Sequence, residues 1–181
     1  MFFFAVVVLM FIALVVQHFI GPLPQIEARV LLMPLVMFYG ALAFPTAGML
    51  ALAFIGGLMW DALHVQIVAG EPEVGLGYSI VLYAVLGGLM SGFRPLFLRG
   101  RWEVHCLLSG VCTSIIVLVE YLMISIRREP VRFVFDQEIW WRIGGAGLVA
   151  LLLSPFVFFA LNYLGHLTGY DPQPDRLQKR L

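Results

Sequence analysis

Six apolar runs, each about as long as a helix must be to cross the hydrocarbon layer of a membrane, follow one another along this chain. The breaks between them are short and hold turn-forming residues, as in GPLPQIE and FPTAG. The second run contains a proline, Pro34, which a membrane helix tolerates because its surroundings satisfy the freed backbone groups. The runs predict helices at about 2–20, 28–44, 47–63, 78–93, 104–125 and 139–164.

The composition places these helices in a lipid bilayer. Of the 181 residues, 61% are hydrophobic and 12% are charged, whereas roughly 25% are charged in an average soluble domain. The unbroken apolar runs are too long for the alternating strands of a membrane barrel. The sequence therefore predicts an all-α integral membrane protein, a six-helix transmembrane bundle over residues 1–165 followed by a short polar tail, 166–181. We detect no internal repeat.

Charge excludes one class of partner and orients the helices. The net charge is zero and no basic run occurs, so nothing indicates binding to nucleic acid. Short cytoplasmic loops carry an excess of Lys and Arg, which favours a topology with both termini in the cytoplasm. On the predicted cytoplasmic side lie Arg94, Arg99, Arg101, Arg176, Lys179 and Arg180, and on the other side Arg29, Arg127, Arg128 and Arg132.

Three charged residues fall at similar depth near the predicted outer ends of the helices. Asp61 closes the third run, Glu120 lies within the fifth, and Arg142 begins the sixth. Charged side chains at membrane depth pair with one another or mark a functional site. We expect Glu120 and Arg142 to face the bundle interior and approach each other, with Asp61 close enough to share the cation. The alternative is that Asp61 and Arg142 extend to the interface while Glu120 faces a wet crevice.

No motif for catalysis, a metal or a cofactor accompanies these charges. The chain has neither HExxH nor a serine with a neighbouring base, and its two cysteines, Cys106 and Cys112, have no metal-site spacing. The segment GEPEVGLGYS lacks the lysine and preceding strand of a phosphate-binding loop and is interpreted as a turn into the fourth helix. We therefore expect no enzymatic activity, no bound metal and no cofactor.

Aromatic residues indicate the ends of the predicted helices, and small residues indicate where the helices pack. The tryptophans Trp60, Trp102, Trp140 and Trp141 and the histidines His18, His64, His105 and His166 lie near predicted helix ends, which is typical of the membrane interface. Small residues four apart let membrane helices approach closely. The pairs Ala53 and Gly57 in the third run, and Gly88 and Gly92 in the fourth, are candidates for helix packing.

The order of these features resembles the rod shape-determining protein MreD family. The resemblance covers nearly the whole chain and rests on the segments YGALAFPTAGMLALAFIGGLMWDAL, GLGYSIVLYAVLGGLMSGFRP and LLLSPFVFFALNYL. Its most specific element is a Gly-Leu-x-x-Asp signature, matched here by Gly57, Leu58 and Asp61 and followed after a short loop by Gly75. Asp61 is thus the one charged candidate that the family signature includes.

The resemblance implies a non-enzymatic scaffold of the bacterial inner membrane. Members of this family act with MreC, the actin-like MreB, the glycosyltransferase RodA and a class B penicillin-binding transpeptidase in the cell-elongation complex, which directs side-wall peptidoglycan synthesis and cell shape. Their six-helix arrangement is similar to the substrate-binding S-components of energy-coupling-factor vitamin transporters. A second hypothesis is therefore a small-molecule binding subunit of a membrane transporter, whose ligand would meet the few polar residues Asp61, Glu120, Tyr121 and Asn162.

Overall fold

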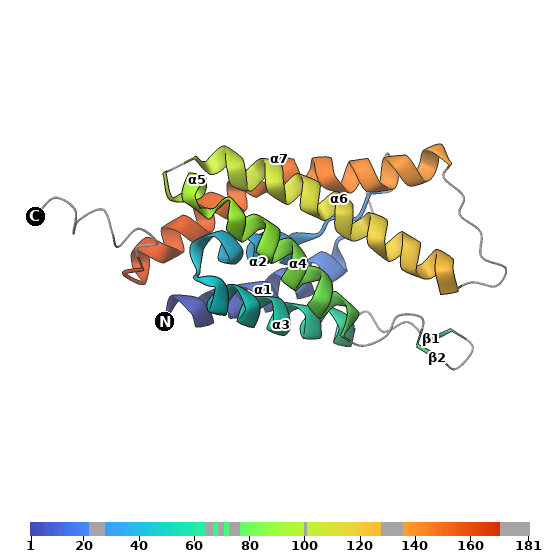
Figure 1. Cartoon of the computed structure of the whole chain (residues 1–181), viewed down its shortest axis with the longest axis horizontal. Helices are drawn as coiled ribbons and strands as arrows, with labels where there is room; N and C mark the ends of the chain where they lie inside the picture. The colour runs from blue at the N-terminus through green and yellow to red at the C-terminus, as the bar shows by residue number, and fades with distance from the viewer. Residues whose placement is uncertain are drawn as a thin grey trace, which may run out of the picture.

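Helices form most of the structure, which is a computed structural model (Figure 1). It describes residues 1–21, 28–63, 67–68, 71–72, 77–99, 101–127 and 136–170. The helices are α1 (Phe2–Phe19), α2 (Leu32–Ala43), α3 (Thr46–Leu63), α4 (Tyr78–Gly92), α5 (Arg94–Leu98), α6 (Trp102–Arg127) and α7 (Gln137–Leu167). Between α3 and α4, β1 (Ile67–Val68) and β2 (Glu71–Pro72) pair antiparallel. Each predicted apolar run thus contains a helix, whereas the short α5 and the β1–β2 pair are elements that the sequence pattern did not predict.

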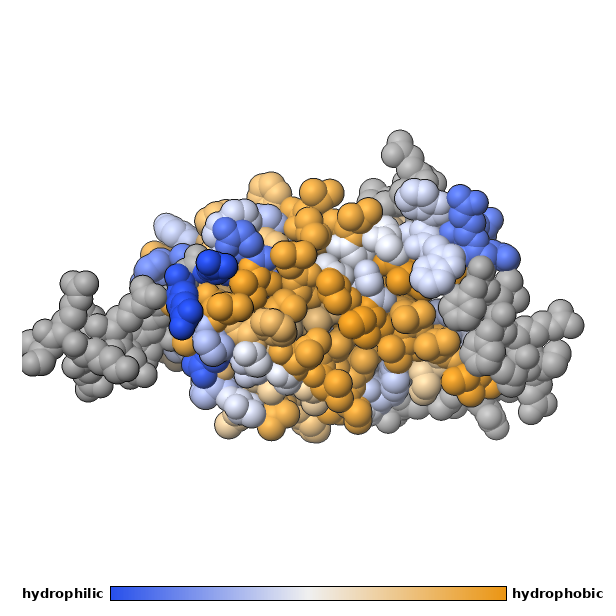
Figure 2. Space-filling view, turned by 45° about the horizontal axis from the view of Figure 1, so that its top comes forward, coloured by the Kyte–Doolittle hydropathy of each residue, from blue (hydrophilic) through white to orange (hydrophobic). Residues whose placement is uncertain are grey.

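Four helices are long and apolar enough to cross a membrane: α1, α3, α6 and α7. Apolar side chains cover the middle of the face in Figure 2, and hydrophilic residues gather toward its two ends. This distribution is the one that a lipid bilayer requires of a protein that spans it. The finding supports a membrane protein, while α2 and α4, with 12 and 15 residues, are shorter than the roughly 20 residues that a span needs.

The six longer helices pair as three antiparallel hairpins, α1 with α2, α3 with α4 and α6 with α7. Figure 1 shows the start of α1, α5 and the last turns of α7 at one end of the bundle, which we call the Arg99 end. The last turn of α3, the start of α4, the end of α6 and the start of α7 lie at the opposite end, which we call the Asp61 end. Both ends of the described chain therefore lie at the same end of the bundle.

The short helix α2 is the centre of the bundle. It contacts every other described helix, and all its residues from Met33 to Ala43 are buried. A helix that is apolar on every face is surrounded either by protein or by lipid, and in α2 it is the other helices that surround it. The predicted span 28–44 begins too early, because α2 starts at Leu32. Pro34 therefore lies in the first turn, where a backbone N–H has no partner within the helix and its loss costs little.

Two interface predictions are wrong for residues that face the bundle. His105 is 0% exposed and Trp60 is 5% exposed, whereas Trp102, Trp140 and Trp141 are exposed as predicted. His18 and His166 are also exposed, and His64 lies outside the described residues. The position of a residue near a helix end determines its depth in the membrane, but not whether its side chain faces the bundle or the lipid. This explains both errors.

Candidate functional site

At the Asp61 end, a hydrogen bond of the Asp61 side chain connects α3 to the start of α4. Its side chain is 6% exposed, and Oδ2 accepts a hydrogen bond of 2.6 Å from the backbone N–H of Gly77, the N-cap residue of α4. Gly77 has a φ of 96°, a left-handed conformation that glycine adopts without strain. A carboxylate next to a helix N-terminus also interacts favourably with the helix dipole. Asp61 is thus a buried charge whose partner is the backbone of the next helix.

Gln17 performs the corresponding function for α2. The side chain is 6% exposed, and its Oε1 accepts hydrogen bonds from the backbone N–H groups of Leu32 and Met33, at 2.9 and 3.1 Å. These groups begin α2, whose own N-cap residue, Leu31, provides no side-chain acceptor. Sequence reasoning missed Gln17. The available signal was its position as a polar residue near the end of an apolar run, which is also the position of Asp61.

The opposite end of α2 is held by two side chains from distant parts of the chain. The carbonyl oxygen of Ala43 accepts hydrogen bonds from Arg94 at 3.4 Å and from the hydroxyl of Tyr170 at 3.1 Å. The last carbonyls of a helix lack partners within the helix, and a cation near them is favourable. Both ends of the buried central helix are therefore capped by side chains from other elements.

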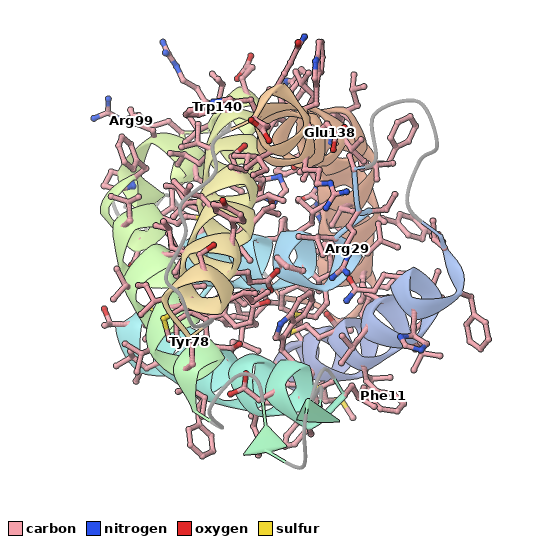
Figure 3. The ribbon with its side chains drawn as sticks, turned by 90° about the vertical axis from the view of Figure 1, so that its right-hand side faces the viewer. Phe11, Arg29, Tyr78, Arg99, Glu138 and Trp140 are labelled. Atoms are coloured by element: carbon pink, nitrogen blue, oxygen red, sulfur yellow. The ribbon has the colours of Figure 1, made fainter. Side chains whose placement is uncertain are left out.

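Glu120 is the second acidic residue of the site and lies in the half of α6 that is nearer the Asp61 end. Glu120 is half-buried, and its carboxylate accepts a hydrogen bond from the side chain of Trp60 in α3. Arg29, which precedes α2, supplies the cation that interacts electrostatically with it. Figure 3, which looks at the bundle from the Asp61 end, shows Arg29 inside the ring of helices. Glu120 thus joins α6 to α3 and to the segment before α2.

Two tyrosines of α4 bring the environments of Asp61 and Glu120 together. The phenols of Tyr78 and Tyr83 each interact electrostatically with both carboxylates. The rings of Tyr83 and Trp60 meet edge to face, with centroids 6.3 Å apart. The hydroxyls of Tyr78 and Tyr83 are buried without a hydrogen-bond partner. The site at the Asp61 end therefore combines two carboxylates, an indole, two phenols and a guanidinium.

Arg142 does not lie where we predicted it. Its side chain is exposed near the start of α7, so the expectation that it faces the bundle interior is wrong. A long cationic side chain near a helix end reaches the aqueous boundary at little cost, whereas burial would remove it from water. Arg29 is a cation that interacts with Glu120, and its position at the same end of the bundle was the signal that the sequence offered.

Of the predicted packing residues, those in α3 are packed against other helices and those in α4 are not. Ala53 is 0% exposed, and a Cβ on Gly57 would lie 2.5 Å from the backbone of Ile80, so Gly57 allows α3 and α4 to approach closely. A Cβ on Gly88 or Gly92 would contact nothing within 4 Å, so the predicted packing role of this pair is wrong within the chain. The buried glycine of α4 is the neighbouring Gly87, which faces Met37 and Met49.

Within the described residues no group of three or more His, Cys, Asp and Glu side chains could hold a metal ion. Cys106 and Cys112 are buried free thiols. The groups described above at the Asp61 end can form hydrogen bonds and ion pairs. Comparison with known proteins gives no match: no family model fits the chain, and no curated protein or solved structure matches it.

Proposed function

We propose that the protein is a non-enzymatic scaffold of the bacterial inner membrane that binds MreC in the cell-elongation complex. Through MreC, the proposal connects it directly or indirectly with RodA, the class B transpeptidase and MreB. The resemblance to the MreD family is one support for this proposal. The other is the role of the signature residues in the structure.

The proposal rests mainly on the positions and contacts of the residues of the Gly-Leu-x-x-Asp signature. Gly57 permits close packing of α3 on α4, and Asp61 binds the N–H of Gly77. Both residues thus shape one helical hairpin. Leu58 between them is 50% exposed. A signature that builds a hairpin and presents an apolar residue outward suits a protein that acts by contact with a partner helix.

The proposed topology has six helices in the membrane and both termini in the cytoplasm, in an arrangement similar to that of S-components. The central position of α2 supports it, since a helix enclosed by others does not itself have to meet both surfaces of the bilayer. Arg99 and Arg101 are exposed at the end where α1 starts and α7 finishes. By the distribution of positive charge, that end faces the cytoplasm.

The outer face of the α3–α4 hairpin is where we propose that MreC docks. Leu50, Phe54 and Leu58 follow one another at helical spacing on α3 and are 48%, 55% and 50% exposed. On α4, Gly88 and Gly92 leave open space on their surface. Small residues at such a surface permit a close approach by a single transmembrane helix.

Co-purification with MreC from the same genome tests the proposal. The wild-type chain, extracted in mild detergent after co-expression, should retain MreC. A Gly88→Ile, Gly92→Ile double variant should lose most of it, because the new side chains fill the open surface. Gly144→Ile is the matched control, since Gly144 also has open space around it but lies on α7. A wild-type chain that never retains MreC would refute the scaffold function.

A small-molecule binding subunit remains the second candidate, because Glu120 is half-buried beside unpartnered phenols and an indole. A few polar groups in an apolar surround are typical of a ligand pocket. A thermal-shift screen across vitamins separates the two functions. Saturable stabilisation by one compound, lost in Glu120→Leu, would favour the transporter subunit, whereas no response together with retention of MreC would favour the scaffold.

A further inference from the structure

The exposed apolar surface of the bundle is much shorter on α4 than on α7. On α4 it extends from Val81 to the C-cap residue Phe93, which are 65% and 40% exposed. These residues are 12 positions apart, or about 18 Å along the helix at roughly 1.5 Å per residue. On α7 it extends from Trp141 to Leu167, which are 54% and 67% exposed and 26 positions apart, or about 39 Å. The apolar face of α4 is thus less than half as long as that of α7.

Within the described residues, polar groups border the face of α4 at both of its ends. Arg94 follows Phe93 directly, and at the other end the N-cap residue Gly77 is bound by the carboxylate of Asp61. Figure 1 shows α4 inclined to the long axis of the bundle, so its face projects onto that axis over less than its own length. The hydrocarbon layer of a typical bilayer is about 30 Å thick, so a face of about 18 Å is shorter than this layer by roughly 12 Å.

At the Arg99 end, the end of α4 and the end of α7 lie at the same level. The carbonyl oxygen of Ala43 accepts hydrogen bonds from both Arg94, which follows α4, and Tyr170, which follows α7. One atom therefore holds both segments. Because the two faces start level at this end, their difference in length must appear at the other end.

At the Asp61 end, the α6–α7 hairpin extends beyond the α3–α4 hairpin. Glu120 of α6 accepts a hydrogen bond from Trp60 of α3, which relates the levels of the two helices. Beyond this contact α3 ends after three residues, at Leu63, whereas α6 continues for seven residues, to Arg127. Figure 1 shows the end of α6 and the start of α7 beyond the end of α3 and the start of α4. The two sides of the bundle thus fit hydrocarbon layers of different thickness.

We propose that the lipid bilayer is locally thinner where it contacts α4 than where it contacts α7, because lipid headgroups at the Asp61 end lie closer to the middle of the membrane beside α4. A bilayer accommodates an apolar stretch shorter than its hydrocarbon layer by thinning around it. In a layer of uniform thickness that covers the face of α7, the polar groups at the start of α4 would lie in hydrocarbon, which is costly. The proposal requires that α4 and α7 lie in the membrane, and it does not depend on the scaffold function.

Local thinning has a consequence for association in the membrane. Deforming the bilayer costs free energy for each Å of mismatch, and this cost drives some helices to associate. A helix that covers the face of α4 removes lipid from it and so removes the cost. The short face of α4 therefore favours the binding of a partner helix on this side over the side of α7.

Depth-dependent fluorescence quenching tests the proposal on the protein alone. In a Cys106→Ala, Cys112→Ala background, Val81→Cys is labelled with bimane and reconstituted into vesicles of dioleoyl phosphatidylcholine. One set of vesicles contains phosphatidylcholine with a nitroxide on the headgroup, and a second set contains phosphatidylcholine with a nitroxide at the twelfth carbon of an acyl chain. The measured quantity is the ratio of headgroup quenching to acyl-chain quenching, each relative to the same variant in lipid without nitroxide.

The matched controls are Leu152→Cys and Phe156→Cys on α7, at positions that are 67% and 74% exposed. They lie about 22 and 16 Å along the helix from Leu167, and these values bracket the distance of about 18 Å between Val81 and Phe93. The controls therefore lie about as far from the Arg99 end as Val81 does. In a bilayer of uniform thickness, all three labels have similar depths and similar quenching ratios.

We expect the quenching ratio of Val81→Cys to exceed both control ratios by at least about twofold, because thinning places this label near the headgroups. A ratio equal to those of the controls would overturn the proposal. A label that neither nitroxide quenches would also overturn it, since the face of α4 would then not contact lipid. If Val81→Cys melts below the background, Val85→Cys replaces it with Phe159→Cys as its control, since each lies about 12 Å from the end of its face at the Arg99 end. The scaffold function is tested separately, by retention of MreC.

Discussion

Gln17 and Asp61 hold equivalent places in two successive hairpins. Each lies two residues before the end of an 18-residue helix, and each accepts a hydrogen bond from a backbone N–H where the following helix begins. In both hairpins a long helix therefore supplies the cap for a shorter one. The two hairpins thus share this capping contact, although the acceptor is an amide oxygen in one and a carboxylate oxygen in the other.

Asp61→Ala should destabilise the protein by about 1–2 kcal/mol, the usual cost of losing a side-chain acceptor at a helix N-terminus. Asp61→Asn keeps an acceptor oxygen and should cost less. The matched control is Asp136→Ala, because Asp136 is the N-cap residue of α7 but makes no side-chain cap hydrogen bond. Melting temperatures in one detergent provide the measurement, and equal losses in Asp61→Ala and Asp136→Ala would contradict the capping role.

Gln17→Leu should cost a similar amount, because it leaves the part-buried N–H of Leu32 and the buried N–H of Met33 without their acceptor. Part of the loss is offset, since Gln17 Nε2 is itself buried without a partner and disappears with the substitution. Gln137→Leu, an exposed change in the first turn of α7, is the control. Thermal unfolding that shows no difference between the two variants would mean that α2 does not depend on this cap.

The sequence predicted the helices well because membrane burial leaves long apolar runs that turn residues interrupt. It predicted Asp61 as a buried acid and Gly57 as a packing residue, since a charge at depth and a small residue each have few acceptable environments. It did not predict the partners. Which cation meets Glu120 depends on how α6 and the segment before α2 are placed in space, and depth alone made Arg142 as good a candidate as Arg29. The exposed position of Gly88 likewise depends on the rotation of α4, which the Gly88–Gly92 spacing does not determine.

Gly57→Ala and Gly88→Ala should have different effects on the stability of the folded protein. A methyl group on Gly57 would lie 2.5 Å from the N and Cα atoms of Ile80, so the two helices must separate, at a cost of about 1–3 kcal/mol. At Gly88 the methyl group meets nothing within 4 Å, and alanine favours the helix over glycine by up to about 1 kcal/mol. Melting temperatures should therefore fall for Gly57→Ala and stay the same or rise for Gly88→Ala. A loss in both variants would mean that the surface near Gly88 is covered.

The contact between Trp60 and Glu120 should appear as a coupling energy in a double-mutant cycle. Trp60→Phe removes the indole N–H and Glu120→Leu removes the carboxylate, so each single change leaves one group without its partner. The double variant should be more stable than the sum of the single losses predicts, by about 0.5–3 kcal/mol, which is the range for residues in direct contact. Arg29→Gln should also couple to Glu120→Leu, more weakly because Arg29 is exposed and solvent screens its charge. Arg99→Gln, exposed at the opposite end of the bundle, serves as the control cation, and Arg142→Gln is measured beside it. Coupling of Glu120 to Arg142 and not to Arg29, measured by the same unfolding assay, would restore the pairing first predicted from depth and contradict the site described here.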